Sequence, residues 1–157
     1  MQLEDAATIL ARTEFFRICD AEQRRLLAFA SERKRHKAAS VIYQAGEMPQ
    51  GAHVLVSGTV ATYEQDESNP FVVSVPGSLF GAASLVIARA RPVTIKAVDQ
   101  VETLFVPRSG FMKLCNQFPD LAARARDRIR ADLSDYLTAI ETLGPKFGAS
   151  SGKGYKG

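Results

Sequence analysis

Cysteine and histidine are scarce in this sequence, with two of each among 157 residues. Cys19 and Cys115 stand alone, without a CxxC pair or a Cys/His cluster, which argues against a disulfide framework and against a zinc or iron–sulfur site. His36 and His53 are far apart in the sequence and have no acidic or thiol neighbour at the spacing that metal ligands need. We therefore expect two reduced thiols, in the core or near the surface, and no metal site.

Long apolar runs and a large excess of one charge are also missing. No segment approaches the roughly 18 uninterrupted apolar residues of a membrane span, and the first residues are not a basic stretch followed by an apolar run. The net charge is only +3, which favours neither nucleic acid nor a membrane as partner. The basic run Arg33–Lys37 contains no aromatic residue for base stacking, and we expect it to be a solvated face. These absences predict a soluble, cytoplasmic protein.

No arrangement of residues suggests catalysis. Ser57 and Ser78 occupy turn positions, with no histidine or aspartate pattern that would activate a nucleophile. No acid/base pair stands out either. We predict that the protein is not an enzyme, with no catalytic residue and no bound cofactor.

The first 35 residues are expected to form helices. Asp5 can cap the first one, in which Ile9 and Leu10 face inward. Asp20, with Gln23 three residues later, has the pattern of a capping box and predicts the start of another helix. The buried stripe of that helix is expected to contain Leu26, Leu27 and Ala30.

From about Lys34 the pattern changes to short β-branched and aromatic runs separated by glycines, which indicates strands joined by tight turns. Because no helices intervene, antiparallel pairing in a β-roll or jelly roll is favoured over a parallel sheet. The predicted strands are 41–43, 53–56, 59–63, 71–75, 93–98 and 101–106.

After Pro107 the helical pattern returns. Ser109 can cap a short helix, and Pro119 is expected to open a long one. Five apolar residues of the long helix step by four and three, as in a heptad seam, and this predicts pairing with another helix in a homodimer or with a partner protein. The seam consists of Ile129, Leu133, Tyr136, Ile140 and Leu143. Length and composition predict one domain, residues 1–143, followed by a flexible Gly/Lys/Ser tail at 144–157.

The stretch from Phe80 to Leu85, followed by Arg91, is typical of a turn that holds a phosphate. Backbone N–H groups of a small glycine turn point at an anion, and a guanidinium pairs with its oxygens. We expect a ligand site here.

The order of these elements resembles the cyclic nucleotide-binding domain of catabolite-activator-type regulators, protein kinase A regulatory subunits and gated channels. Gly46-Glu47, residues 55–60, residues 76–81 and Arg91 follow the order and spacing of that family, and the resemblance covers residues 9–143. It implies an α+β fold, in which N-terminal helices flank an antiparallel β-roll of about eight strands and a long helix follows. It also implies a regulatory sensor whose ligand is cyclic AMP, cyclic GMP or another anion.

By the same resemblance, residues 80–93 form the phosphate-binding cassette. Gly81 and Arg91 keep their places in it, whereas Ala82 stands where a glutamate accepts from the sugar hydroxyl, and Pro92 where a small residue donates its N–H. We therefore expect cyclic nucleotide to bind weakly, in a shifted pose or not at all. Arg91 either binds an anion, or is a surface arginine or one that pairs internally with an acidic side chain of the protein. The predicted cassette contacts are Phe80, Gly81, Ala82, Ala83, Ser84, Arg91, Pro92 and Val93.

Tyr136, in the long helix, has two possible roles: it can contact the base of a nucleotide, or it can belong to the dimer seam. Regulators of this family carry a helix-turn-helix after that helix, and only 14 residues follow Leu143, so we expect no DNA binding by that route. Two hypotheses remain for the function of the whole protein: a sensor with a degenerate cassette, or a ligand-free interaction and dimerisation module on the same fold.

Overall fold

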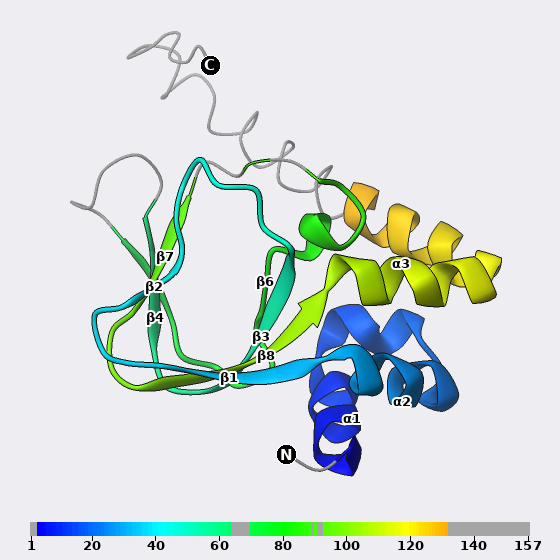
Figure 1. Cartoon of the computed structure of the whole chain (residues 1–157), viewed down its shortest axis with the longest axis horizontal. Helices are drawn as coiled ribbons and strands as arrows, with labels where there is room; N and C mark the ends of the chain where they lie inside the picture. Colours follow the sequence, from blue (N-terminus) through cyan, green and yellow to red (C-terminus); the bar gives the residue numbers. More distant parts are fainter. Residues whose placement is uncertain (1–2, 64–69, 89, 91–92, 132–157) are drawn as a thin grey trace, which may run out of the picture.

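Two four-stranded antiparallel sheets form a β-roll, and helices cover one end of it (Figure 1). The computed structural model describes residues 3–63, 70–88, 90 and 93–131. The α+β class and the β-roll are confirmed. The helical elements are α1 (Leu3–Arg12), η1 (Glu14–Ile18), α2 (Ala21–Ala30), η2 (Ala82–Leu85) and α3 (Arg108–Gln117). The strands are β1 (Glu32–His36), β2 (Val41–Tyr43), β3 (Gly51–Ser57), β4 (Val60–Tyr63), β5 (Phe71–Val73), β6 (Leu79–Phe80), β7 (Thr94–Ala97) and β8 (Val101–Pro107).

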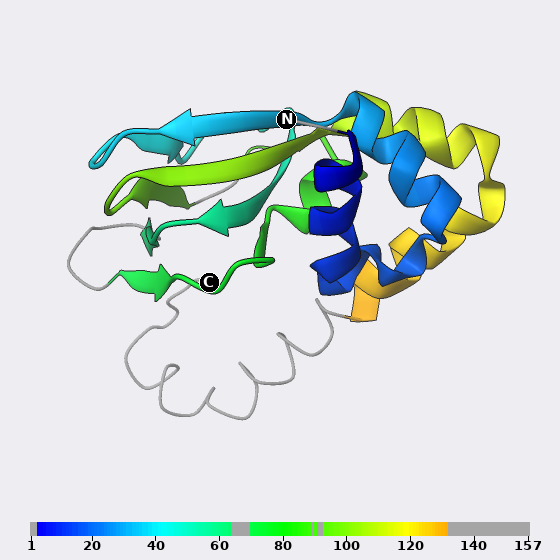
Figure 2. The same ribbon diagram turned by 90° about the horizontal axis from the view of Figure 1, so that it is seen from below.

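The strand orders are β1-β8-β3-β6 in one sheet and β2-β7-β4-β5 in the other, so β1 and β2 are edges. Figure 2 shows the β-roll extending to one side of the helical end. All six predicted strands exist, with ends shifted by up to two residues. Two strands differ from the prediction: the basic run Arg33–Lys37 lies largely in β1, and the two-residue β6 was missed because it is too short for an alternating pattern.

The predicted capping box at the start of α2 is confirmed. The Gln23 backbone N–H donates to Asp20 Oδ1 at 2.7 Å, and the Asp20 N–H donates to Gln23 Oε1 at 2.9 Å. The other two predicted caps are wrong. Asp5 lies inside α1, and Ser109 lies inside α3, whose N-cap residue is Pro107 without a side-chain cap.

The buried stripe of α2 is also displaced from the predicted one. Gln23, Leu27 and Ala28 are buried, whereas Leu26 and Ala30 are exposed. The capping box explains the shift, because it turns the Gln23 side chain inward, and Leu27, four positions later, shares its helix face.

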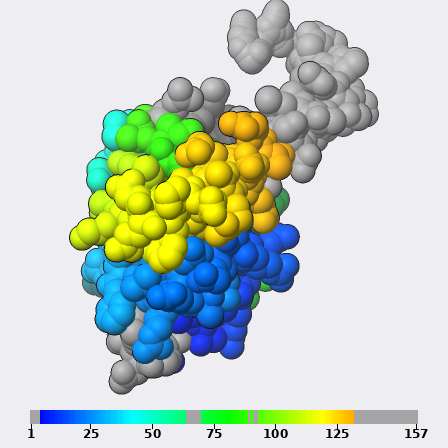
Figure 3. All heavy atoms as spheres, turned by 90° about the vertical axis from the view of Figure 1, so that its right-hand side faces the viewer, coloured from blue at the N-terminus to red at the C-terminus, as the bar shows by residue number. Residues whose placement is uncertain are grey.

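Two apolar cores hold the domain together. The helical core joins α1, η1, α2 and α3 to β3 and β8, and its rings Phe16 and Phe111 lie 6.4 Å apart. The roll core lies between the two sheets and contains Tyr43, Leu55, Val60, Ile95, Ala97 and Val101. Figure 3 shows α2 in blue and α3 in yellow side by side on the helical end.

A second long helix begins at Pro119, as predicted, and the structure describes it to residue 131. Ile129, the first residue of the predicted seam, is half-buried against the helical core. The other seam residues, Leu133, Tyr136, Ile140 and Leu143, lie outside the described residues, as does the predicted tail at 144–157. No helix in the described ranges is both long and apolar enough to cross a membrane.

Candidate ligand site

The predicted cassette begins with a left-handed turn. Strand β6 leads into Gly81, whose backbone has φ +85° and ψ 36°, a conformation that glycine adopts without strain. The helix η2 follows at once, and the Ser84 N–H donates to the Gly81 carbonyl at 2.8 Å. The turn that the sequence predicts at the start of the cassette is therefore formed.

Residues of the cassette pack into both cores. Phe80 and Val93 contact the roll core, whereas Ala82 contacts the helical core and is half-buried. Ala83 is exposed, and Ser84 is 2% exposed with a hydroxyl that has no hydrogen-bond partner among the described residues. Arg91 and Pro92 lie outside the described residues, as does Tyr136.

Arg108 connects the cassette to α3. Its Nη1 donates to the Ser84 carbonyl at 3.1 Å and to the Pro49 carbonyl at 2.9 Å, while its backbone N–H donates to the Gln50 carbonyl at 2.8 Å. These bonds join η2 and the β2–β3 loop to the first residue of α3. The sequence reasoning missed Arg108, because the carbonyls it contacts are 24 and 59 residues away along the chain.

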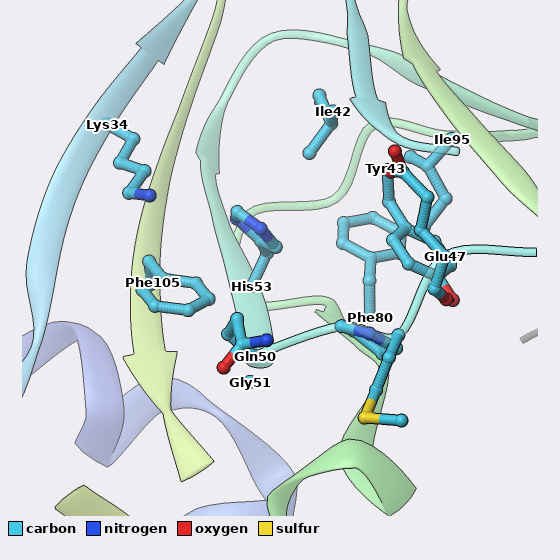
Figure 4. Close-up of a pocket in the computed structure, with 12 residues that line it drawn as sticks. Lys34, Ile42, Tyr43, Glu47, Gln50, Gly51, His53, Phe80, Ile95 and Phe105 are labelled. Carbon is cyan, nitrogen blue, oxygen red and sulfur yellow. The ribbon is translucent and has the colours of Figure 1, made fainter. Parts of the chain in front are cut away.

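A cavity of about 200 Å³ opens into the roll between its sheets. In Figure 4, Lys34, His53 and Phe105 project from β1, β3 and β8 on one wall, facing Ile42, Tyr43 and Ile95 of β2 and β7. The β2–β3 loop forms the rim, held by a hydrogen bond from Tyr43 Oη to the Glu47 carbonyl at 2.6 Å. The described lining is Lys34, Ile42, Tyr43, Glu47, Met48, Pro49, Gln50, Gly51, His53, Phe80, Ile95 and Phe105.

The two histidines, far apart in sequence, meet inside the roll. His36 Nε2 lies 3.1 Å and His53 Nδ1 3.0 Å from the same Thr103 hydroxyl, and the rings are 5.8 Å apart. Burial lowers the pKa of His53 to about 3, with further contributions from His36 and Lys34. Burial and Lys34 also lower the pKa of His36. Both imidazoles are therefore neutral near pH 7. Among the described residues no group of three or more His, Cys, Asp or Glu side chains could hold a metal ion.

The prediction that Arg33–Lys37 forms a solvated face is wrong for every second residue. Arg33 and Arg35 point outward to Glu102, at 2.7 and 3.1 Å, and the hydrogen bond from Arg33 is the main cause of a lowered Glu102 pKa. Lys34 and His36 point inward and are half-buried. Successive side chains of a strand point to opposite faces, so placing this run in a strand would have predicted that every second residue points inward.

Comparison with models of known protein families gives independent evidence for the family of this chain. The model of the family described as "Cyclic nucleotide-binding domain" matches residues 33–118, more than half of the chain. That range runs from β1 to the end of α3 and includes both the cassette and the roll cavity. No curated protein matches the chain.

Solved structures are similar over most of the chain. A cyclic nucleotide-binding-like protein from Brucella abortus is 26% identical, with a TM-score of 0.62, over 71% of this chain and 98% of its own. The sensor domain of the transcriptional regulator DNR from Pseudomonas aeruginosa is 16% identical, with a TM-score of 0.70, over 90% and 97% of the two chains. The N-terminal domain of a transcriptional regulator from Streptomyces coelicolor is 21% identical, with a TM-score of 0.72, over 84% and 94%.

Proposed function

Because the chain belongs to the cyclic nucleotide-binding domain family, we propose that it is a regulatory sensor domain with a degenerate phosphate cassette. One observation carries this proposal. Gly81 has the left-handed backbone that an anion-binding turn needs, but the next residue is Ala82, whose methyl group packs against the helical core. The turn is kept, while the carboxylate that would accept from a ribose hydroxyl is absent.

The energetic consequence is a weaker site for cyclic nucleotide. A hydrogen bond to a carboxylate contributes about 1.5–3 kcal/mol, so losing it weakens ribose binding by about one to two orders of magnitude. Pro92 supplies no N–H to a phosphate oxygen. Arg91 remains as the cation for an anion, so the ligand is a weakly bound or shifted cyclic nucleotide, or a different anion. The domain acts by binding rather than by catalysis, in the cytoplasm.

Calorimetric titration with cyclic AMP, cyclic GMP and cyclic dinucleotides tests this proposal. We expect wild-type protein to bind them at millimolar concentrations at best, and Arg91→Ala to abolish that binding. The double substitution Ala82→Glu with Pro92→Ala should tighten binding at least about tenfold. Submicromolar binding by the wild type would contradict the loss of function in the cassette. If neither the wild type nor the double variant binds any of these ligands, the sensor proposal is wrong for cyclic nucleotides.

The second candidate is a ligand-free interaction module, and exposed apolar side chains on the helical end favour it. Phe29 is 70% and Leu26 is 38% exposed on α2, while Met112 on α3 is 39% exposed. Large apolar side chains in water mark an interaction surface when they gather on one face. Leu26 and Phe29 are three residues apart and share a helix face.

Sedimentation separates the two ways in which such a module could pair. Wild type is compared with Leu133→Asp, Ile140→Asp and Phe29→Asp. A dimer that dissociates in the first two variants pairs through the predicted seam, and one that dissociates only in Phe29→Asp pairs through α2. A monomer in all four proteins would discard homodimerisation.

A further inference from the structure

The described lining of the roll cavity shares one residue, Phe80, with the predicted cassette. Its described lining comes from β1, β2, β3, β7, β8, the β2–β3 loop and Phe80 of β6, with no residue from 81–88, β4 or β5. Strands β1 and β2 are the edges of their sheets, so the cavity reaches the margin of the roll that these two strands form. A molecule can therefore occupy it without contacting η2.

Positive charge enters this cavity without a compensating carboxylate. Lys34 is half-buried and its Nζ lies 4.4 Å from the centre of the Phe105 ring. No described carboxylate forms an ion pair with it, since Glu102 is engaged with the outward Arg33 and Arg35. Glu47 is the one acidic residue in the described lining, and it is exposed on the rim, where water screens its charge. A half-buried ammonium in a partly apolar wall favours an anion as its partner.

The walls are suited to a flat ring. Phe105 lies 5.1 Å from His53 at an interplanar angle of 51°, and Phe80 and Tyr43 line the same space. Aromatic rings at such separations gain from edge-to-face and offset contacts beyond the area they bury. A volume of about 200 Å³ is below the roughly 300–1,000 Å³ of pockets for drug-sized ligands. The cavity therefore fits a single-ring molecule rather than a nucleotide.

His53 offers a polar group in the wall that can orient such a molecule. Thr103 is fully buried and its hydroxyl contacts His53 Nδ1, whereas no described residue bonds to His53 Nε2. When the Thr103 hydroxyl donates to Nδ1, the neutral imidazole carries its proton on Nε2 and can donate it to an anion. His36 Nε2 then donates to the Thr103 oxygen, which satisfies the hydroxyl on both sides.

We propose that the roll cavity is a second ligand site for a small aromatic carboxylate, which shares Phe80 with the cassette but uses Lys34 rather than Arg91 as its cation. The carboxylate pairs with Lys34 and accepts from His53 Nε2, and the ring packs among Phe80, Phe105 and Tyr43. The site does not depend on whether the cassette binds a cyclic nucleotide.

Calorimetric titration of the full chain at pH 7 with benzoate, benzamide and acetate tests the chemistry without any substitution. Benzamide keeps the ring and loses the charge, and acetate keeps the charge and loses the ring. We expect benzoate to bind with a submillimolar Kd and the other two at least about tenfold more weakly. Equal affinity for benzoate and benzamide, or no binding of benzoate at millimolar concentrations, would overturn the proposal.

Substitutions then locate the bound anion. Lys34→Gln should weaken benzoate at least about tenfold, whereas Lys37→Gln, an exposed lysine just after the same strand, should leave the affinity unchanged. Arg91→Ala should also leave it unchanged. Benzoate binding that is lost in Arg91→Ala and kept in Lys34→Gln would place the anion at the cassette and refute a second site. Failure of cyclic nucleotide to bind would refute a cyclic nucleotide sensor and would leave the proposal for the roll cavity unaffected.

Discussion

Arg108 donates from Nη1 to the Ser84 carbonyl at 3.1 Å, and this bond joins the cassette helix η2 to the first residue of α3. The same nitrogen donates to the Pro49 carbonyl on the rim of the roll cavity. One half-buried guanidinium thus contacts the cassette, the cavity rim and the helix that leads out of the roll. A ligand that favours one position of η2 would bias the position of α3 through this group.

Replacing Arg108 should destabilise the domain. Hydrogen bonds that involve a charged group contribute about 1.5–3 kcal/mol, and Arg108→Gln would leave two carbonyls without this donor, so we expect a loss of about 2 kcal/mol in the free energy of unfolding. Urea unfolding followed by circular dichroism measures it. Arg126→Gln, at an exposed arginine, is the matched control and should change the midpoint little. Equal midpoints for both variants would show that the Arg108 bonds add no stability.

The neutral histidines predict a loss of stability in mild acid. The folded-state pKa of His53 is about 3, far below the ordinary value of 6.5. Below pH 6.5 the unfolded chain therefore binds a proton that the folded chain does not, and the free energy of unfolding falls as the pH falls towards 3. The slope from His53 is at most about 1.4 kcal/mol per pH unit, and the lowered pKa of His36 adds to it in the same direction.

Unfolding at pH 7.5, 6.0 and 5.0 measures this slope. Glu102 does not interfere, since its pKa is lowered from 4.5 and its contribution is lost only below that value. His53→Gln should show a clearly smaller slope between pH 6.0 and 5.0 than wild type. The same slope in both proteins would mean that His53 is not neutral in the folded state.

Two turn glycines have different surroundings, and replacing each by alanine should therefore cost different amounts of stability. Gly58 and Gly46 have similar positive φ values, +95° and +92°. A Cβ on Gly58 would lie 2.5 Å from the Gln100 carbonyl oxygen, whereas a Cβ on Gly46 would meet nothing within 4 Å. Gly46→Ala should lose about 1–2 kcal/mol for the left-handed backbone alone, and Gly58→Ala clearly more, because backbone must move. Thermal unfolding of the pair tests this, and equal losses would rule out the close approach.

Both cysteines should be protected from alkylation in the folded protein. Burial raises the Cys19 pKa from 9.0 to about 12, and burial also raises the pKa of Cys115. Because the thiolate is the nucleophile, a shift of this size slows the reaction of Cys19 roughly a thousandfold at pH 8, before access is considered. Mass spectrometry after iodoacetamide treatment, with and without urea, measures how much of each cysteine has been alkylated. Rapid labelling of Cys19 without urea would be inconsistent with its burial.

The sequence was sufficient to predict a structural feature where the residues that form it are close together along the chain. The Asp20–Gln23 capping box spans three residues, and the left-handed Gly81 satisfies a local steric requirement, so both were predictable. The predicted caps at Asp5 and Ser109 were wrong because a suitable residue type does not by itself fix where a helix begins. A cap residue is only one of several residues that can begin a helix: Asp5 lies inside α1, and α3 begins at Arg108, one residue before Ser109.

The amino-acid sequence by itself determined the order of helices and strands, the antiparallel roll and the left-handed turn at Gly81, because periodicity, turn glycines and spacing depend on neighbours along the chain. Only the tertiary structure decided that Lys34, His36, His53 and Thr103 share the inner face of one sheet, and that Arg108 reaches Ser84 and Pro49. Those contacts depend on the register between strands 50 or more residues apart and on the position of α3. Pairing across the sheet is stabilised by burial on both of its faces, and that burial exists only in the assembled domain.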